Sequence, residues 1–189
     1  LVVRLVRPEE VVALDHQKQA EAARWHYRRA TELQPRSHEP WNNLGVSLLS
    51  TGEFAAAADA LEEAGRLEPR DAAVWNNLGV ARGRMRQYDA ALAAFRKAGD
   101  ELSAQNNLGA MYQHGVGVEQ SYPLAVEWYR KAAEKGDSFA QANLAAMYQN
   151  GWGVEKNDAL ALEWYRKCAA QGYAAGGRRA ASPAPSRPG

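Results

Sequence analysis

The chemistry that recurs in this sequence is that of the asparagine carboxamide. The tetrad Asn-Asn-Leu-Gly occupies residues 42–45, 76–79 and 106–109, and a fourth copy at 142–145 keeps one asparagine. A carboxamide both donates and accepts hydrogen bonds, so it can pair with a peptide backbone whatever the sequence of that peptide. Asparagine is also a weaker helix former than alanine. Its return in four copies therefore indicates a use other than helix formation.

Two interpretations of these amides stay open. In the first they line a face that binds a peptide, and in the second they bond neighbouring helices or face water. Each hydrogen bond from a side-chain amide contributes about 0.5–1.5 kcal/mol net. A handful of such hydrogen bonds therefore falls short of the roughly 8 kcal/mol of binding free energy in a micromolar complex. Other side chains on the same face would have to supply the remainder. The predicted peptide-binding residues are Asn42, Asn43, Val46, Asn76, Asn77, Val80, Arg84, Asn106, Asn107, Gln113, His114, Asn143 and Gln149.

The sequence offers no motif for catalysis, a metal or a cofactor. The histidines His16, His26, His38 and His114 are scattered, with no Glu or Cys at metal-ligand spacing. No glycine-rich phosphate loop follows a strand, and no Ser or Cys nucleophile has a base at a recognisable spacing. The single cysteine, Cys168, excludes an intrachain disulfide and is expected to be a buried structural thiol. The chain is therefore predicted to be non-enzymatic, with no cofactor and no metal.

Composition narrows the class of partner. The 189 residues carry 23 Lys plus Arg against 22 Asp plus Glu, without the basic face that nucleic-acid binding requires. No apolar run approaches the roughly 18 residues of a membrane-spanning helix, so membrane insertion is not expected. The first residue is not Met, and a targeting signal could have been removed. The compartment stays open, with the cytoplasm slightly favoured over the periplasm or another secretory compartment.

The tetrads belong to a longer period that predicts pairs of helices. Pro35 returns at Pro69 and Trp41 at Trp75, both 34 residues later. Apolar residues at helical spacing form two faces within this unit; the first is Trp41, Leu44, Gly45 and Leu48, and the second is Phe54, Ala57, Leu61 and Ala64. Gly52 is expected to end the first helix in a left-handed conformation. A fixed period of this length indicates helix pairs that stack on one another.

These residues resemble the tetratricopeptide repeat, a helix-turn-helix unit. The match rests on Trp41, Leu44, Gly45, Ala57, Leu61, Ala64 and Pro69, and a second copy repeats it at Trp75, Leu78, Gly79, Ala91, Phe95 and Ala98. The second copy departs at Arg82, where the family has a large apolar residue. The stretch before both copies matches only in part. There we expect one helix to start at Pro8-Glu9-Glu10 and a second to run from about residue 19 to residue 33.

Farther along the chain the period lengthens to 36 residues, with Gly115 returning at Gly151 and Gly117 at Gly153. This pattern resembles the Sel-one-like repeat, a relative of the tetratricopeptide repeat with a longer loop between its helices. The matching residues include Leu108, Gly109, Met111, Tyr112, Ala125, Trp128 and Tyr129 in one copy and Leu144, Met147, Tyr148, Ala161, Trp164 and Tyr165 in the next. The first glycine of each loop is expected to cap a helix with positive φ. Ser121 and Asn157 are expected to begin the following helices as N-caps.

Together the resemblances imply an all-α fold, a right-handed α-solenoid of antiparallel helix pairs. The predicted units are an irregular repeat at 4–37, tetratricopeptide repeats at 38–71 and 72–101, Sel-one-like repeats at 102–137 and 138–172, and a disordered tail at 173–189. In this family the first helices line the concave face. Asn43, Asn77, Asn107 and Asn143 would then share one inward position, as in the asparagine ladders of some tetratricopeptide superhelices.

The function that the resemblance implies is a scaffold or adaptor that binds a peptide or a partner protein in the concave groove. The alternative is a self-assembly module, because the helix at about 158–171 has no evident capping helix after it. Some Sel-one-like proteins have been described as β-lactamase-like, but those carry a cysteine pair in each repeat, and this chain has one cysteine in all.

Two further features each have two interpretations. Arg82, Arg84 and Arg86 crowd one predicted helix, either as a solvated face or as a docking site for an acidic partner. Trp152 replaces the Val116 of the preceding copy. It is either an interface residue, since aromatic residues are enriched at hot spots, or it packs over its own helix pair.

Overall fold

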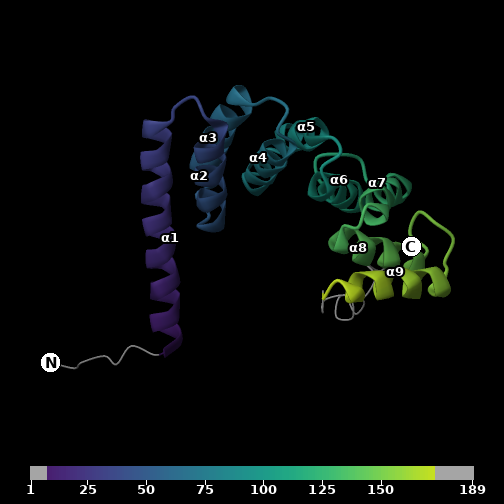
Figure 1. Cartoon of the computed structure of the whole chain (residues 1–189). Helices are drawn as coiled ribbons and strands as arrows, with labels where there is room; N and C mark the ends of the chain where they lie inside the picture. Colours follow the sequence, from purple (N-terminus) through teal and green to yellow (C-terminus); the bar gives the residue numbers. More distant parts are fainter. Residues whose placement is uncertain (1–7, 173–189) are drawn as a thin grey trace. The chain divides into compact units, whose positions relative to one another are not determined.

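The computed structural model describes the backbone of residues 8–172 and the side chains of residues 21–172. Within that range the chain forms nine α-helices and no strand (Figure 1). It divides into two compact units, Leu1–Ala98 and Gly99–Gly189, each of which is described by itself. The predicted disordered tail at 173–189 lies outside the described residues.

The first unit holds five helices: α1 (Pro8–Leu33), α2 (His38–Ser50), α3 (Phe54–Leu67), α4 (Ala72–Arg84) and α5 (Tyr88–Ala98). The second unit holds four: α6 (Leu102–His114), α7 (Tyr122–Glu134), α8 (Ser138–Asn150) and α9 (Asp158–Ala170). Consecutive helices pack together within each unit, as the pairing of α2 with α3 and of α8 with α9 illustrates.

Helix α1 differs from the prediction for the start of the chain. It does begin at Pro8, as expected, but it continues unbroken to Leu33, where two helices were predicted. The prediction of a break was wrong, because residues 9–20 contain no glycine or proline that would interrupt the backbone hydrogen bonds. This single long helix packs against α2.

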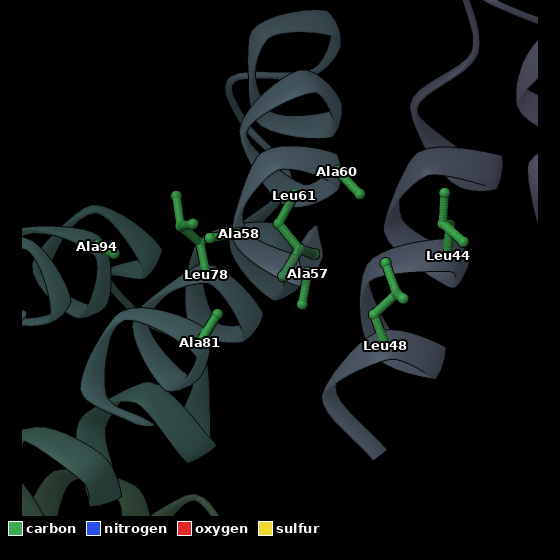
Figure 2. Close-up of a cluster of buried hydrophobic side chains, with 9 residues drawn as sticks. All are labelled: Leu44, Leu48, Ala57, Ala58, Ala60, Leu61, Leu78, Ala81 and Ala94. Atoms are coloured by element: carbon green, nitrogen blue, oxygen red, sulfur yellow. The ribbon is translucent and has the colours of Figure 1, made fainter. Parts of the chain in front are cut away.

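The core of the first unit lies between α2, α3 and α4. Figure 2 shows Leu61 of α3 between the leucines of α2 on one side and Leu78 of α4 on the other. Small residues, Ala57, Ala58, Ala60, Ala81 and Ala94, fill the remaining contacts of this cluster. Alanine at these positions lets the helix axes approach closely, because its side chain adds little bulk between them.

The glycine of each tetrad is required by the packing inside a helix pair. A Cβ atom added at Gly45 would lie 2.5 Å from Leu61 Cγ, and one added at Gly79 would lie 2.5 Å from the Phe95 ring. Both distances are shorter than carbon atoms tolerate without movement. The tetrad glycine therefore allows the first helix of a pair to rest directly on a large side chain of the second.

The loops of the second unit are built as predicted. Gly115 ends α6 and Gly151 ends α8, both in the left-handed conformation, with φ of 64° and 67°. The hydroxyl of Ser121 accepts a hydrogen bond from Leu124 N, and the Asn157 side chain accepts one from Leu160 N. These side chains satisfy amide groups that the first turn of each helix leaves unpaired.

Candidate peptide-binding face on the first helices

The predicted site residues lie on the first helix of each pair, namely α2, α4, α6 and α8, and every one of them reaches the surface. Asn43, Val46, Arg84 and His114 are exposed. The others, Asn42, Asn76, Asn77, Val80, Asn106, Asn107, Gln113, Asn143 and Gln149, are half-buried. Helical spacing explains this, because residues three, four and seven apart share one face of a helix.

Two pairs of these asparagines bond one first helix to the next within a unit. In the first unit Asn77 Nδ2 donates to Asn42 Oδ1 at 3.1 Å. In the second unit Asn143 Nδ2 donates to Asn106 Oδ1 at 2.9 Å. Donor and acceptor both belong to the predicted peptide-binding set. The donor occupies the position that Asn43, Asn77, Asn107 and Asn143 share, and the acceptor is the neighbouring position of the preceding tetrad.

These bonds are the helix-to-helix contacts that the second interpretation of the amides describes. They use only part of each amide, since an asparagine has two N–H groups and an oxygen with two lone pairs. The donor keeps its oxygen and one N–H, and the acceptor keeps both of its N–H groups. The two interpretations are therefore compatible for one and the same side chain.

The two glutamines of the predicted site each accept a hydrogen bond inside their own helix pair. Tyr129 Oη of α7 donates to Gln113 Oε1 of α6 at 2.6 Å, and Tyr165 Oη of α9 donates to Gln149 Oε1 of α8 at 3.2 Å. Burial raises the pKa of both tyrosines, so their hydroxyls remain protonated donors at neutral pH. Sequence reasoning missed this bond, although the spacing of 16 residues between Gln and Tyr recurs in both copies.

Sequence reasoning also missed Phe139, a residue of α8 that is 50% exposed. It stands one helical turn before Asn143, and residues four apart lie on the same face of a helix. Amide hydrogen bonds alone do not supply the binding free energy of a micromolar complex. An exposed aromatic ring on the same face of the helix is the kind of apolar side chain that could supply the remainder. The i, i+4 spacing from the asparagine was the signal that could have found it.

The predicted residues fall into one set in each unit. Residues 42–84 of the set belong to the first unit and residues 106–149 to the second. Within each unit the asparagines lie on neighbouring first helices, as the two asparagine–asparagine hydrogen bonds show. A single line of inward amides through both sets stays a prediction.

Trp152 packs against the preceding helix pair. Its ring stacks on that of Tyr122 at the start of α7, with centroids 5.6 Å apart and planes 13° from parallel. The adjacent Gly153 is equally constrained, because a Cβ there would lie 2.4 Å from the Tyr122 carbonyl carbon. Trp152 thus contributes to the cohesion of the second unit.

Cys168 is buried in α9, as expected for a structural thiol. Burial raises the pKa of this thiol, which disfavours the thiolate that nucleophilic chemistry uses. Within residues 21–172 no three potential ligands gather into a metal site. None of the described helices is long and apolar enough to cross a bilayer.

The fold and the bonds between repeats define an all-α solenoid of antiparallel helix pairs. A tetratricopeptide repeat model matches residues 11–67 and 42–106, and a Sel1 repeat model matches residues 102–137 and 138–173. The chain therefore belongs to the tetratricopeptide repeat family, and its C-terminal part carries Sel1 repeats. A comparison with curated proteins finds no significant match.

Solved structures with the same helical-repeat fold are similar to this chain. A protective antigen of uropathogenic Escherichia coli that displays an SLR fold is 28% identical over 83% of the chain, with a TM-score of 0.67. This chain spans about a third of the length of that antigen, since it covers 35% of it. A Sel1 repeat protein from Oxalobacter formigenes is 29% identical, with a TM-score of 0.55, over 60% of this chain and 89% of its own.

A likeness at lower identity supports the fold alone. MamA is 19% identical, with a TM-score of 0.61, and the match covers 89% of this chain and 96% of MamA. Helical-repeat folds of this class are typical protein-interaction scaffolds, in which stacked units present an extended surface.

Proposed function

We propose that the protein is a non-catalytic scaffold that binds an extended peptide segment of a partner protein across the asparagine-bearing face of its first helices. The observation that supports this most directly is the pairing of the amides. Each Asn–Asn bond holds two carboxamides at half-buried positions and leaves donors and acceptors over. Amides that are already oriented lose little side-chain entropy when a peptide binds.

The same face carries apolar side chains that can supply the rest of the affinity. Val46 is 44% exposed in the first unit and Phe139 is 50% exposed in the second. Removing apolar surface of this kind from water contributes about 25 cal/mol per Å². Amides that bind a backbone, together with apolar anchors, give a surface that selects an extended segment by its shape and a few side chains.

Asn43 and Asn77 allow a clean test of this proposal. Peptides are first selected on the whole chain from a random-peptide display library, and their Kd values are measured by fluorescence anisotropy. Asn43 is exposed, whereas Asn77 bonds Asn42, so Asn43→Ala removes ligand contacts without removing that bond. We expect both Asn43→Ala and Asn77→Ala to weaken binding at least fivefold, with Gln34→Ala, an exposed residue outside the face, as the matched control.

The outcome that overturns the proposal is defined for the same peptides. Affinities that stay within twofold of the wild type in both asparagine variants would place the binding elsewhere. Thermal unfolding of each variant separates the loss of the Asn42–Asn77 bond from the loss of ligand contacts.

A second candidate function is self-association through α9, and one comparison favours it. Leu162 of α9 is 49% exposed, whereas Val126 at the same position of α7 is 3% exposed, because α8 packs on α7. A second copy of the chain could cover this apolar face. Light scattering over a concentration series would show a dimer that Leu162→Glu abolishes, and a wild-type chain that stays monomeric throughout would exclude this function.

A further inference from the structure

The end of α4 and the turn after it carry three arginines that the preceding repeat lacks. Arg82, Arg84 and Arg86 stand 34 residues after Leu48, Ser50 and Gly52. A leucine, a serine and a glycine in one copy have thus become three positive charges in the next. The two copies otherwise keep the same turn.

The turn after α4 forces Arg86 into a conformation that favours glycine. Its φ is 60°, and it is the non-glycine residue with positive φ in the described part of the chain. The backbone bonds match those of the glycine turn, since Arg86 N donates to Gly83 O at 3.0 Å, as Gly52 N donates to Leu49 O at 3.2 Å. An L-residue in the left-handed region is strained by contact between its Cβ and the backbone. Such strain points to a use for the side chain, because glycine would fill the turn without it.

The three guanidinium groups differ in what they contact. Arg82 pairs with Glu62 of α3 and donates to Gln87, so it ties the helices of the first unit together. Arg84 and Arg86 are exposed, and within the described residues neither has an ion-pair partner. The α-helix dipole places partial negative charge near the last turn, which favours Arg84 but leaves its guanidinium available.

We propose that Arg84 and Arg86 bind an acidic segment of the peptide partner. This inference rests on the proposed function, because Arg84 lies seven residues after Asn77 and so shares its face of α4. A guanidinium binds a carboxylate through two parallel hydrogen bonds. Acidic side chains of a segment that crosses the asparagines would reach Arg84 on the helix and Arg86 in the turn beyond it.

An acidic polypeptide fits this surface better than a nucleic acid does. Nucleic-acid binding calls for a basic face or stripe that follows many phosphates, and this chain has a net charge of +1. Asp89 stands three residues beyond Arg86 and limits the length of the basic surface. Two unpaired arginines suit two or three carboxylates.

The test uses a fluorescein-labelled octaglutamate peptide and the whole chain, with anisotropy at low salt. Arg84→Ala and Arg86→Gly should each weaken binding at least fivefold. Arg70→Ala, which removes an exposed arginine from another turn of the first unit, should change it less than twofold. Added salt should weaken binding by the wild type, as it does for exposed charges.

Arg86→Gly separates a binding role from a structural one. It should raise the midpoint of thermal unfolding while it lowers affinity for octaglutamate, because it removes strain and charge together. A variant that loses both stability and affinity would overturn the inference. Equal losses with Arg70→Ala, or tighter binding of an oligothymidylate of equal charge, would also overturn it.

The inference and the proposed function can fail separately. In one outcome Asn43→Ala weakens binding of the selected peptides, while the arginine substitutions leave octaglutamate binding unchanged. This outcome would reject the acidic segment and support the proposed scaffold function. Octaglutamate that depends on the arginines, together with selected peptides that ignore the asparagines, would keep the acidic site and reject the amide face.

Discussion

The helix pairs α6/α7 and α8/α9 follow one 36-residue pattern, yet they hold their tyrosines differently. Tyr129 is 1% exposed, and its hydroxyl lies 2.6 Å from Gln113 Oε1. Tyr165 is half-buried, and its hydroxyl lies 3.2 Å from Gln149 Oε1. The same residue types in the same slots therefore form a tight bond in one pair and a looser one in the other.

Two differences around the tyrosines account for this. The helix that faces Tyr129 carries Gly109, whereas the corresponding residue of the next pair is Ala145. In addition α8 packs on α7, while no described helix follows α9. The comparison teaches that in a stacked repeat the environment of a side chain depends on the next unit as much as on its own.

The largest expected effect comes from Gly109→Ala, which gives the pair α6/α7 the alanine that the pair α8/α9 has at Ala145. A Cβ at Gly109 would lie 2.6 Å from the Tyr129 ring, so we expect a loss of about 1–3 kcal/mol in the free energy of unfolding. Urea denaturation of the whole chain measures it. Gly83→Ala is the control, because its Cβ would meet Ala91 at an ordinary 3.9 Å, and better helix propensity should stabilise it by up to about 1 kcal/mol. A gain of stability in both variants would contradict the comparison.

Helix α8 covers α7, and the effect of this cover is tested by shortening equivalent side chains of α7 and α9, Val126 and Leu162. Val126→Ala removes buried methyl groups and should lower the free energy of unfolding by about 1.5 kcal/mol. Leu162→Ala alters an exposed side chain and should stay within about 0.5 kcal/mol. Chemical denaturation at low protein concentration compares them. Equal losses would mean that the face of α9 is covered in solution.

The two tyrosine bonds are compared by removing each hydroxyl. Tyr129→Phe leaves the Gln113 oxygen without its donor and should cost about 1 kcal/mol, whereas Tyr165→Phe should cost less because water reaches that site. Thermal unfolding followed by circular dichroism ranks the two. Adding Gln113→Met to Tyr129→Phe should restore most of the loss, since both polar partners are then gone. No recovery in the double variant would show that the hydroxyl acts through other contacts.

The smallest effect concerns charge, because a salt bridge in one pair corresponds to a neutral bond in the next. Lys135 Nζ donates to Asp100 Oδ1 at 2.8 Å, whereas Gln171, the equivalent of Lys135, donates to Gln141 at 2.9 Å. The Lys135 hydrogen bond and charge lower the pKa of Asp100. A carboxyl group whose pKa falls on folding stabilises the fold above its unfolded pKa, and this contribution disappears as the pH drops through the folded pKa.

Lys135→Gln should therefore reduce the fall in unfolding temperature between pH 5 and about pH 3 by a small amount. Differential scanning calorimetry at low salt measures the difference. Lys156→Gln is the control, because Lys156, in the loop before α9, lies a longer 3.6 Å from Asp158 at the start of that helix. An unchanged pH profile in Lys135→Gln would show that the exposed bridge contributes nothing to folding.

Local features of the fold were predictable because they depend on nearby residues. The left-handed caps at Gly115 and Gly151 follow from a glycine placed shortly after the last apolar residues of a helical pattern. The N-caps at Ser121 and Asn157 follow from a polar residue placed shortly before such a pattern begins. The continuous α1 was missed, because a partial match to a repeat suggested a turn that the local residues do not encode.

The candidate site was predictable only as a set of positions. Helical spacing brought Asn43, Asn77 and Val46 to the surface of their helices, as the periodicity predicts. Spacing says nothing about partners on other helices, so the Asn77–Asn42 and Tyr129–Gln113 bonds appeared only in the structure.

The sequence by itself determined the repeat, its helix ends and the faces that meet, because each of these follows from residues within one or two turns of each other. The tertiary structure decided which contacts the residues at the recurring positions make. Gly45 and Gly79 let the helices of each pair approach closely, and the stacking of one pair on the next brings amides of different repeats together. That spacing comes from the packing of side chains far apart in the chain, and no local pattern contains it.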